Sequence, residues 1–186
     1  MTRKRVFLTG TTGSMGGSAL KHLLERGTCD IVTLVRPSGK NRAAMKAYDG
    51  EPSLEIVWGD LTRYEDVLRC VTGADMVLHP AAFIAPAADH DPETAWKINL
   101  GAAEHIVRAI KAQPHPDAIK LVNIGTVAET GDRLPPIHLG RTGDPLKPSI
   151  FDMYACSKIA AERVVAESGL RYWVSCRQTY IATANP

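Results

Sequence analysis

The sequence predicts an α/β protein, a doubly wound parallel sheet of about six strands with helices on both faces. Two observations lead to this prediction. Short apolar runs rich in β-branched residues alternate with longer stretches in which apolar residues recur every three or four positions. The short runs are apolar along their whole length, which is typical of parallel strands that are buried on both faces and joined by helical crossovers.

The predicted elements follow one another in a regular order. The six strands are expected at residues 5–9, 30–35, 54–57, 76–79, 119–124 and 172–176. The helices between them are expected at 14–26, 41–48, 63–71, 93–111 and 151–168. No shift in composition marks a second domain, so residues 1–186 are expected to form one domain. Segment 129–150 is rich in Gly and Pro and is expected to form a loop over the site.

Composition and charge exclude several classes of protein. With 22 basic and 20 acidic residues in no long run of one sign, the chain offers no electrostatic reason to bind nucleic acid or a membrane. Its four cysteines show no CxxC spacing, and no signal peptide or membrane span is evident, so a reducing compartment, the cytoplasm, is expected. The six histidines are scattered, and no metal site is expected.

The stretch "TGTTGSMG" lies between the first predicted strand and the first predicted helix. In a doubly wound fold this turn sits at the carboxyl edge of the sheet, where the helix N-terminus offers unpaired N–H groups to a phosphate. Gly10 permits a tight turn, Gly13 leaves room for a pyrophosphate and Gly16 lets the helix pack close to the strand. The turn therefore predicts a dinucleotide site, formed here by Gly10, Thr12, Gly13, Ser14, Met15 and Gly16.

The end of the second strand bears on the choice of dinucleotide. NAD-binding folds place an acid there for the ribose, whereas an arginine accommodates the 2′-phosphate of NADP. Arg36 occupies this place, and Asp30 lies at the wrong end of the strand. NADP(H) is therefore the predicted cofactor, with NAD as the alternative. The simpler interpretation of Arg36 is a solvated side chain after a strand.

The segment "YACSK" places Tyr154 and Lys158 four residues apart in a predicted helix, so they share a face. A phenol is a weak acid at neutral pH, and a neighbouring ammonium group stabilises its phenolate and is expected to lower its pKa. The pair is thus a candidate for proton transfer. A tyrosine stacked on a lysine stem is the alternative.

These segments, in their order along the chain, resemble the extended short-chain dehydrogenase/reductase family, which includes NAD-dependent epimerase/dehydratases and 3β-hydroxysteroid dehydrogenase-like reductases. The resemblance rests on "TGTTGSMG", "WGDLT", "HPAA", "NLG", a hydroxyl after the fifth strand, and YxxxK, and it extends over nearly the whole chain. It implies a Rossmann-like fold and nicotinamide chemistry.

The resemblance also implies roles for individual residues. Asp60 and Leu61 would contact the adenine, Ala81 and Ala82 would line the nucleotide groove, and Asn99 would support the site. Without the other motifs, Asp60 would be interpreted as a helix N-terminal acid and Asn99 as an exposed polar residue.

In this family a serine pair precedes the loop after the fifth strand. Alignment on Gly131 puts the catalytic serine at Thr126, with Gly125 in place of its neighbour. Thr126, Tyr154, Lys158 and Asn99 are therefore the expected catalytic set, and the resemblance implies that Lys158 also binds the cofactor by holding the nicotinamide ribose.

The resemblance also bears on assembly and length. The helices that carry "NLG" and YxxxK commonly form a dimer interface in the family, and Ile98, Ala102 and Ala109 give the first of them a second apolar face. A homodimer is expected. Family members are longer, so most of the substrate domain is expected to be absent, and the chain is either a fragment or a shorter relative.

Three functions follow as hypotheses. The first is an NADP(H)-dependent oxidoreductase that transfers hydride between the nicotinamide and a small carbonyl or alcohol substrate, with Thr126 and Tyr154 holding the substrate oxygen. The second is a nucleotide-sugar epimerase or dehydratase that retains NAD. The third is a noncatalytic dinucleotide-binding protein.

Overall fold

The computed structural model describes residues 3–131, 141 and 143–181. These residues form one six-stranded parallel sheet with the strand order β3-β2-β1-β4-β5-β6. The strands are β1 (Lys4–Thr9), β2 (Cys29–Val35), β3 (Leu54–Trp58), β4 (Met76–His79), β5 (Lys120–Thr126) and β6 (Trp173–Gln178). The predicted doubly wound parallel sheet is confirmed, and the strand ends differ from the predicted ones by at most two residues.

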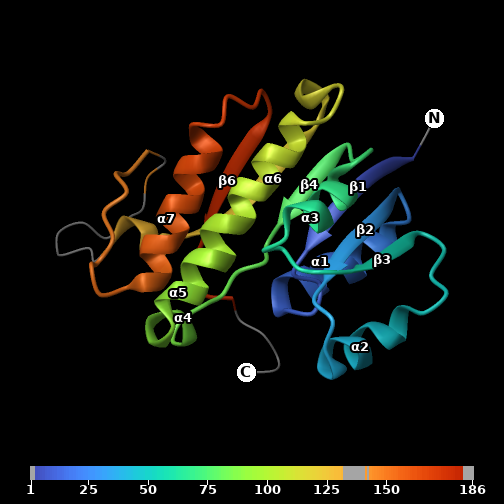
Figure 1. Cartoon of the computed structure of the whole chain (residues 1–186), viewed down its shortest axis with the longest axis horizontal. Coiled ribbons are helices and arrows are strands. Elements are labelled where there is room, and N and C mark those ends of the chain that lie inside the picture. The colour runs from blue at the N-terminus through green and yellow to red at the C-terminus, as the bar shows by residue number, and fades with distance from the viewer. Residues whose placement is uncertain (1–2, 132–140, 142, 182–186) are drawn as a thin grey trace.

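The helices connect the strands as crossovers (Figure 1). The α-helices are α1 (Ser14–Arg26), α2 (Gly39–Met45), α3 (Tyr64–Val71), α4 (Ala87–His90), α5 (Pro92–Ala95), α6 (Gly101–Lys111) and α7 (Met153–Ala166). Short helical turns are η1 (Lys46–Tyr48), η2 (Trp96–Leu100), η3 (Pro116–Ala118) and η4 (Val127–Thr130). The sequence missed α4, η3 and η4, because single turns carry too little hydrophobic periodicity to be recognised.

Each face of the sheet has its own core. On one face Phe7, Val32 and Val77 pack with residues of α3, α6 and α7. On the other face Leu8 and Ile31 pack with α1 and the end of α2. Helices thus cover both faces, as predicted, although Val174 and Cys176 near the end of the sheet at β6 stay exposed.

The predicted helix at 93–111 is continuous but not uniform. It begins as α5, widens into the π-helical turn η2 and continues as α6. Figure 1 shows α6 and α7 side by side, and the two helices are in contact. Ala102 and Ala109, which were expected to face a second copy, are fully buried within the chain. The homodimer stays a prediction, without the support of this apolar face.

None of the helices among the described residues combines the length and the apolar character needed to cross a membrane.

Candidate functional site

The turn between β1 and α1 depends on two glycines for its packing. Gly10 has a positive φ of 65°, and a Cβ there would lie 3.0 Å from backbone atoms of Ala81. A Cβ on Gly16 would lie 2.1 Å from the carbonyl oxygen of Gly10, well inside contact distance. Gly10 thus makes the tight turn and Gly16 permits close packing, as predicted, although Gly16 packs against the turn rather than against the strand.

Gly13 is different, because the fold itself does not need a glycine there. Its backbone is extended, and a Cβ would meet only the Gly10 carbonyl oxygen, at an ordinary 3.4 Å. Gly13 is also the N-cap of α1, and the helix start has neither a side-chain cap nor an acidic residue in its first turn. The uncapped N–H groups and the space beside them fit an anionic group such as a pyrophosphate.

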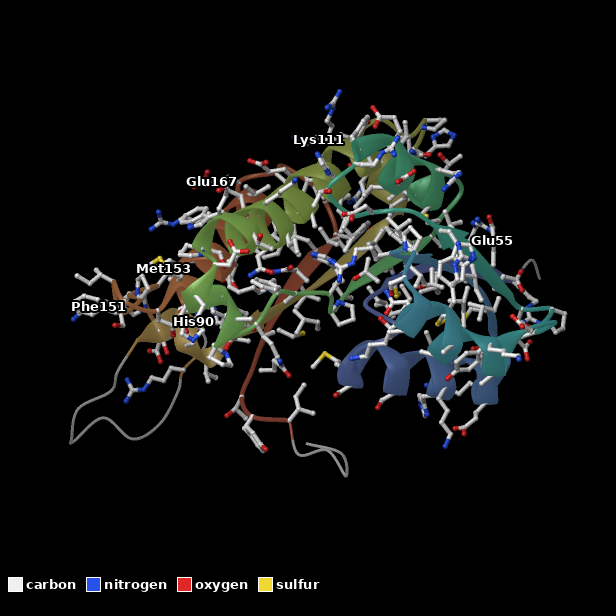
Figure 2. The ribbon with its side chains drawn as sticks, turned by 60° about the horizontal axis from the view of Figure 1, so that its bottom comes forward. Glu55, His90, Lys111, Phe151, Met153 and Glu167 are labelled. Atoms are coloured by element: carbon white, nitrogen blue, oxygen red, sulfur yellow. The ribbon has the colours of Figure 1, made fainter. Side chains whose placement is uncertain are left out.

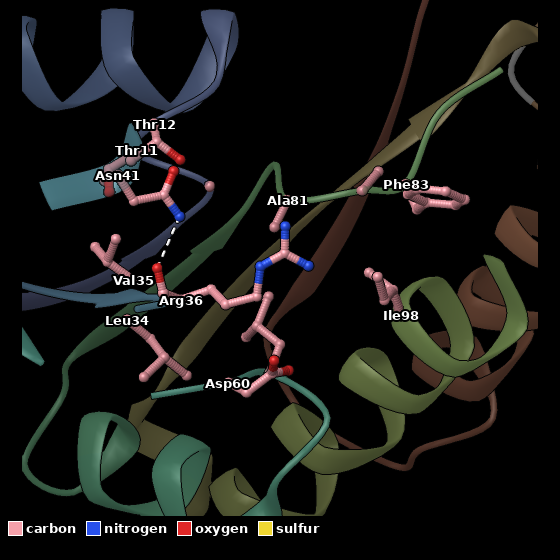
Figure 3. Close-up of a pocket in the computed structure, with 13 residues that line it drawn as sticks. Thr11, Thr12, Leu34, Val35, Arg36, Asn41, Asp60, Ala81, Phe83 and Ile98 are labelled. Carbon is pink, nitrogen blue, oxygen red and sulfur yellow. Dashed lines mark hydrogen bonds between the residues drawn. The ribbon is translucent and has the colours of Figure 1, made fainter. Parts of the chain in front are cut away.

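A cleft opens beside this turn where the strand order reverses between β1 and β4 (Figure 3). Ligands of doubly wound folds bind at such a reversal. The cleft is lined by Gly10, Thr11, Thr12, Leu34, Val35, Arg36, Asn41, Asp60, Leu61, Ala81, Ala82, Phe83 and Ile98. Seven of the expected cofactor residues are among them: Gly10, Thr12, Arg36, Asp60, Leu61, Ala81 and Ala82. Five remain: Gly13, Ser14, Met15 and Gly16 form the adjoining start of α1, and Lys158 is buried on α7 outside the cleft lining.

Sequence reasoning missed six lining residues, which follow β1 and β4, end β2, or lie on α2 and η2. These are Thr11, Leu34, Val35, Asn41, Phe83 and Ile98. Most are apolar or lie outside any motif, so only the meeting of these elements in space identifies them.

Arg36 lies across the cleft as the basic residue of its lining. Figure 3 shows its side chain extended from the end of β2 toward Ala81. Its carbonyl oxygen accepts a hydrogen bond of 2.8 Å from Asn41 Nδ2. Ser38 caps α2 by accepting the Asn41 N–H at 3.1 Å, which holds the segment after β2 in place. Arg36 is exposed to solvent and lines the cleft, so its role in binding a phosphate stays a prediction.

Asp60 is the acidic residue of the same lining. Its Oδ1 accepts hydrogen bonds of 2.8 Å from both the N–H and the hydroxyl of Thr62. Its own N–H donates to Asp66 Oδ2 at 3.0 Å. Asp60 precedes α3 by four residues, so it shapes the turn before that helix rather than capping it.

His79 at the end of β4 is a buried histidine. It is 2% exposed, and its Nδ1 is 2.9 Å from Thr9 Oγ1. Burial lowers its pKa to about 3, and the nearby Lys158 ammonium adds to this shift. His79 therefore stays neutral at physiological pH.

Asn99 connects the cleft to α7. It lies in η2, is 1% exposed, and holds Phe83 with two hydrogen bonds: Oδ1 accepts from the N–H at 2.7 Å and Nδ2 donates to the carbonyl at 3.0 Å. Nδ2 also donates to Ser157 Oγ at 2.9 Å. Asn99 is thus not an exposed polar residue, and it ties the cleft wall at Phe83 to the helix that carries Tyr154.

Thr126, Tyr154 and Lys158 come together at the carboxyl end of β5. The side chains of Thr126 and Tyr154 are close enough for the Thr126 hydroxyl to affect the pKa of the phenol. Thr126 Oγ1 also accepts the Ala128 N–H at 3.3 Å. Lys158, one turn along α7 from Tyr154, is 1% exposed. The three residues predicted from sequence as a catalytic group therefore share one place.

The electrostatics of this group differ from the expectation. The pKa of Tyr154 is raised, mainly by burial and then by the Glu129 carboxyl, with the hydrogen bond from Thr126 opposing the shift. The expected lowering of this pKa by Lys158 is therefore wrong for the chain by itself. The physical reason is that burial of the phenol and the neighbouring Glu129 carboxyl set the direction of the shift, and Lys158 is not among its causes.

Behind this group lies a polar cluster that the sequence analysis missed. Glu129 on η4, Glu162 on α7 and Arg177 on β6 meet at the turn after β5. Thr126 and Glu129 form a reciprocal capping box around η4. The T-x-x-E spacing of this capping box was the available signal, and it spans the start of the segment that was interpreted as a loop.

The family assignment follows from comparison with known proteins. Residues 6–179 match the model of the NAD dependent epimerase/dehydratase family. The chain belongs to this family.

Among curated relatives, the chain is 26% identical over 183 residues to 3β-hydroxysteroid dehydrogenase/Δ5→4-isomerase of Mycobacterium tuberculosis, covering 92% of this chain and 45% of the relative. It is 28% identical over 110 residues to UDP-glucose 4-epimerase of Rickettsia conorii, covering 57% of this chain and 32% of that enzyme. The chain thus spans about half or less of the length of these relatives.

Solved structures show the same fold. The enzyme WbmH of Bordetella bronchiseptica in complex with NAD+ superposes with a TM-score of 0.78 at 27% identity, covering 95% of this chain and 56% of that one. UDP-glucose 4-epimerase of Thermus thermophilus in complex with NAD gives a TM-score of 0.76 at 25% identity, covering 93% and 54%.

The packing of the β1–α1 turn leads to a first prediction. Gly16→Ala is expected to lower the free energy of unfolding by about 1–3 kcal/mol, because the added methyl group meets a backbone carbonyl that cannot move freely. Urea denaturation measures this. Gly101→Ala at the start of α6 is the control, because a Cβ there meets nothing within 4 Å. Equal effects of both substitutions would contradict the packing role of Gly16.

Proposed function

We propose that this chain is the dinucleotide-binding and proton-transferring part of an oxidoreductase that uses NADP(H) to interconvert a small-molecule carbonyl compound and its alcohol. The observation that carries this proposal is the meeting of the Thr126 hydroxyl, the Tyr154 phenol and the buried Lys158 beside the cleft at the reversal of strand order. The family relationship supports it, since relatives include a hydroxysteroid dehydrogenase.

The cleft residues would hold the dinucleotide. The start of α1 would bind the pyrophosphate through its uncapped N–H groups, with Gly13 leaving room for it. Asp60 and Leu61 would contact the adenine, and Ala81 and Ala82 would line the groove. When bound, the nicotinamide ring supplies or accepts the hydride. The support for this assignment is that the lining offers an uncapped helix start and a cation.

The proton would pass through Tyr154. Thr126 Oγ1 accepts the Ala128 N–H, so its own proton can be donated to a substrate oxygen. Because the pKa of Tyr154 is raised, its phenol is protonated at neutral pH and can donate to the same oxygen during reduction. Lys158 would hold the nicotinamide ribose, and Asn99 would position α7 against the cleft wall.

Arg36 supports NADP(H) over NAD(H). Its guanidinium is the cation of the cleft and lies at the end of β2, where a 2′-phosphate would be bound. The second candidate is a nucleotide-sugar epimerase that retains NAD, supported by the relatives of that activity and by the NAD-bound structures of the same fold. The two candidates differ in cofactor preference.

Arg36→Ala is expected to weaken NADPH binding about tenfold or more and to leave NADH binding nearly unchanged, because only NADPH carries the 2′-phosphate. Titration by intrinsic fluorescence or calorimetry at fixed ionic strength measures both constants. Lys40→Ala is the matched control, because Lys40 carries the same charge nearby and lies outside the cleft lining. Tighter binding of NADH than NADPH by the unaltered protein would favour the NAD-retaining epimerase.

Gly13→Ala is expected to weaken the binding of both dinucleotides at least about tenfold, because the methyl group fills the space beside the uncapped helix start. Its free energy of unfolding should change by less than about 1 kcal/mol, since the fold has room for a Cβ there. Calorimetric titration and urea denaturation are the two measurements. Unchanged affinity in a folded variant would place the pyrophosphate elsewhere.

Tyr154→Phe is expected to lower turnover of an accepted aldehyde or ketone about a hundredfold or more while dinucleotide binding is retained, because the proton donor is lost. Oxidation of NADPH followed by its absorbance gives the rate. Tyr172→Phe on an exposed tyrosine serves as the control. Full activity of Tyr154→Phe would exclude the proposed proton transfer. Dinucleotide binding without turnover of any compound in a carbonyl panel would favour a noncatalytic protein.

A further inference from the structure

Two carboxyl groups lie buried behind the proposed proton-transfer group, and the proposed function uses neither. Glu129 is fully buried on η4, and Glu162 is 7% exposed on α7. Burying two carboxylates side by side is costly unless cations balance them or one of them is neutral. Their hydrogen bonds show which of these applies.

Glu162 is bonded as a carboxylate. Its oxygens accept hydrogen bonds from the Ser175 hydroxyl at 2.6 Å and from the Arg177 guanidinium, whose Nε lies 3.1 and 3.2 Å from them. The second guanidinium contact, from Nη2 at 2.5 Å, completes a charge-assisted pair. A group that accepts this many strong donors is stabilised in its ionised form.

Glu129 is bonded differently. Its Oε1 accepts the Thr126 N–H at 2.8 Å. Its Oε2 is buried and receives no hydrogen bond from a donor in the described part of the chain, and the nearest guanidinium nitrogen, Arg177 Nε, is 3.5 Å away. A buried carboxyl oxygen that accepts nothing is satisfied if it carries a proton and donates. Glu129 and Glu162 both lie against Arg177 and interact with each other, so a proton on one of them would remove the repulsion between two adjacent carboxylates.

The glycine at position 125 makes room for this arrangement. A Cβ there would lie 2.9 Å from Glu129 Oε1, 3.1 Å from Glu162 Oε2 and 3.2 Å from Arg177 Cγ. Gly125 stands where the resembling family has one residue of its serine pair. The departure from that pattern thus has a local physical reason: the side chain missing at Gly125 leaves the space that the Glu129 carboxyl occupies.

We propose that Glu129 is a positioning residue held in its protonated form, donating its proton to the ionised Glu162 while its other oxygen fixes the backbone that carries Thr126. The proton sits between Glu129 Oε2 and a Glu162 oxygen, and its loss leaves two adjacent carboxylates. A single proton thereby controls the turn that presents the Thr126 hydroxyl. It also controls the charge that the Glu129 carboxyl places near Tyr154 and Lys158.

The charges around this pair agree with the assignment. The pKa of Glu129 is raised to about 8, mainly by burial and then by the bond to Glu162. Burial would also raise the pKa of Glu162, but hydrogen bonds, first among them that from Arg177, outweigh it and leave this pKa lowered. The other neighbours are Tyr154 and Lys158 on α7, and Asp144, whose carbonyl accepts from Arg177.

The sign of the pH dependence follows from the raised pKa. A glutamate in the unfolded chain ionises near its ordinary value, whereas Glu129 in the fold keeps its proton to about pH 8. The stabilising contribution of neutral Glu129 is therefore complete below the unfolded pKa and is lost progressively as pH rises to about 8. A charged Glu129 paired with Arg177 would instead contribute no pH dependence over this range, because it would be ionised in both the folded and the unfolded state.

Glu129→Gln tests this, because glutamine keeps the acceptor for the Thr126 N–H and donates to Glu162 permanently. Thermal unfolding of the chain without dinucleotide is followed from pH 5 to 9. We expect the stability of Glu129→Gln relative to the unaltered protein to increase as the pH rises to about 8. Over this range the variant should release about one proton fewer on unfolding than the unaltered protein does. Glu167→Gln is the matched control, because Glu167 is an exposed glutamate at the end of α7 (Figure 2). Parallel curves for the unaltered protein and Glu129→Gln, or the opposite slope, would overturn the proposal.

A second measurement needs no variant to fold. In the unaltered protein, the glutamate side-chain carboxyl carbons observed by NMR should include one that titrates near pH 8. If all of them titrate below about pH 6, no buried glutamate holds a proton and the proposal fails. Neither this titration nor the stability curves require turnover, so they test the proton assignment even if the proposed function is wrong.

The catalytic consequence rests on the proposed function. Ionised Glu129 raises the pKa of Tyr154, so its removal should ease phenolate formation. The pH profile of alcohol oxidation by Glu129→Gln is expected to shift toward lower pH relative to the unaltered enzyme. A merely structural role would change the rate at all pH values alike, and an unshifted profile in a folded, active variant would remove Glu129 from the control of Tyr154.

Discussion

The reversal of strand order between β1 and β4 is the constraint on which both parts of the site depend. From β1 the chain builds outward to β2 and β3 and then returns to add β4, β5 and β6 on the other side. The helices that follow β1 and β4 therefore diverge, and a cleft remains at the carboxyl ends of these strands. The close contact of Gly10 with Ala81 forms the floor of this cleft. Without a glycine at that point, the two strand ends could not approach each other.

The same geometry positions the residues that we propose for proton transfer. β5 lies next to β4, and its end carries Thr126 to the position where α7 presents Tyr154 and Lys158. Asn99 connects the two regions by bonding Phe83 on the cleft wall and Ser157 on α7. Its place in a π-helical turn is typical of functional positions in helices. Burying Lys158 and Glu162 on one helix is tolerable because the nearby carboxyls favour the Lys158 ammonium, and because Arg177 and Ser175 on β6 bond to Glu162.

The sequence predicted elements and individual motifs better than contacts. Continuous apolar strands and the Gly10, Gly13 and Gly16 spacing identify the sheet and the turn, because backbone geometry restricts these patterns locally. The expected effect of Lys158 on the pKa of Tyr154 was wrong, because spacing along a helix says nothing about burial. The apolar face expected to form a dimer included Ala102 and Ala109, which are buried within the chain. The sequence did not reveal this burial, because it depends on how the helices pack.

By itself, the sequence determined the order of strands and helices, the glycine turn, the YxxxK pair and the arginine after the second strand, since each depends on residues close together in the chain. Only the tertiary structure decided that Arg36 lies in the cleft with Asp60, and that Asn99 bridges Phe83 and Ser157. It also decided that Gly125 makes room for a buried carboxyl. The reason is physical: solvent exclusion and charge pairing arise between segments far apart in sequence, and they exist only once the chain has packed.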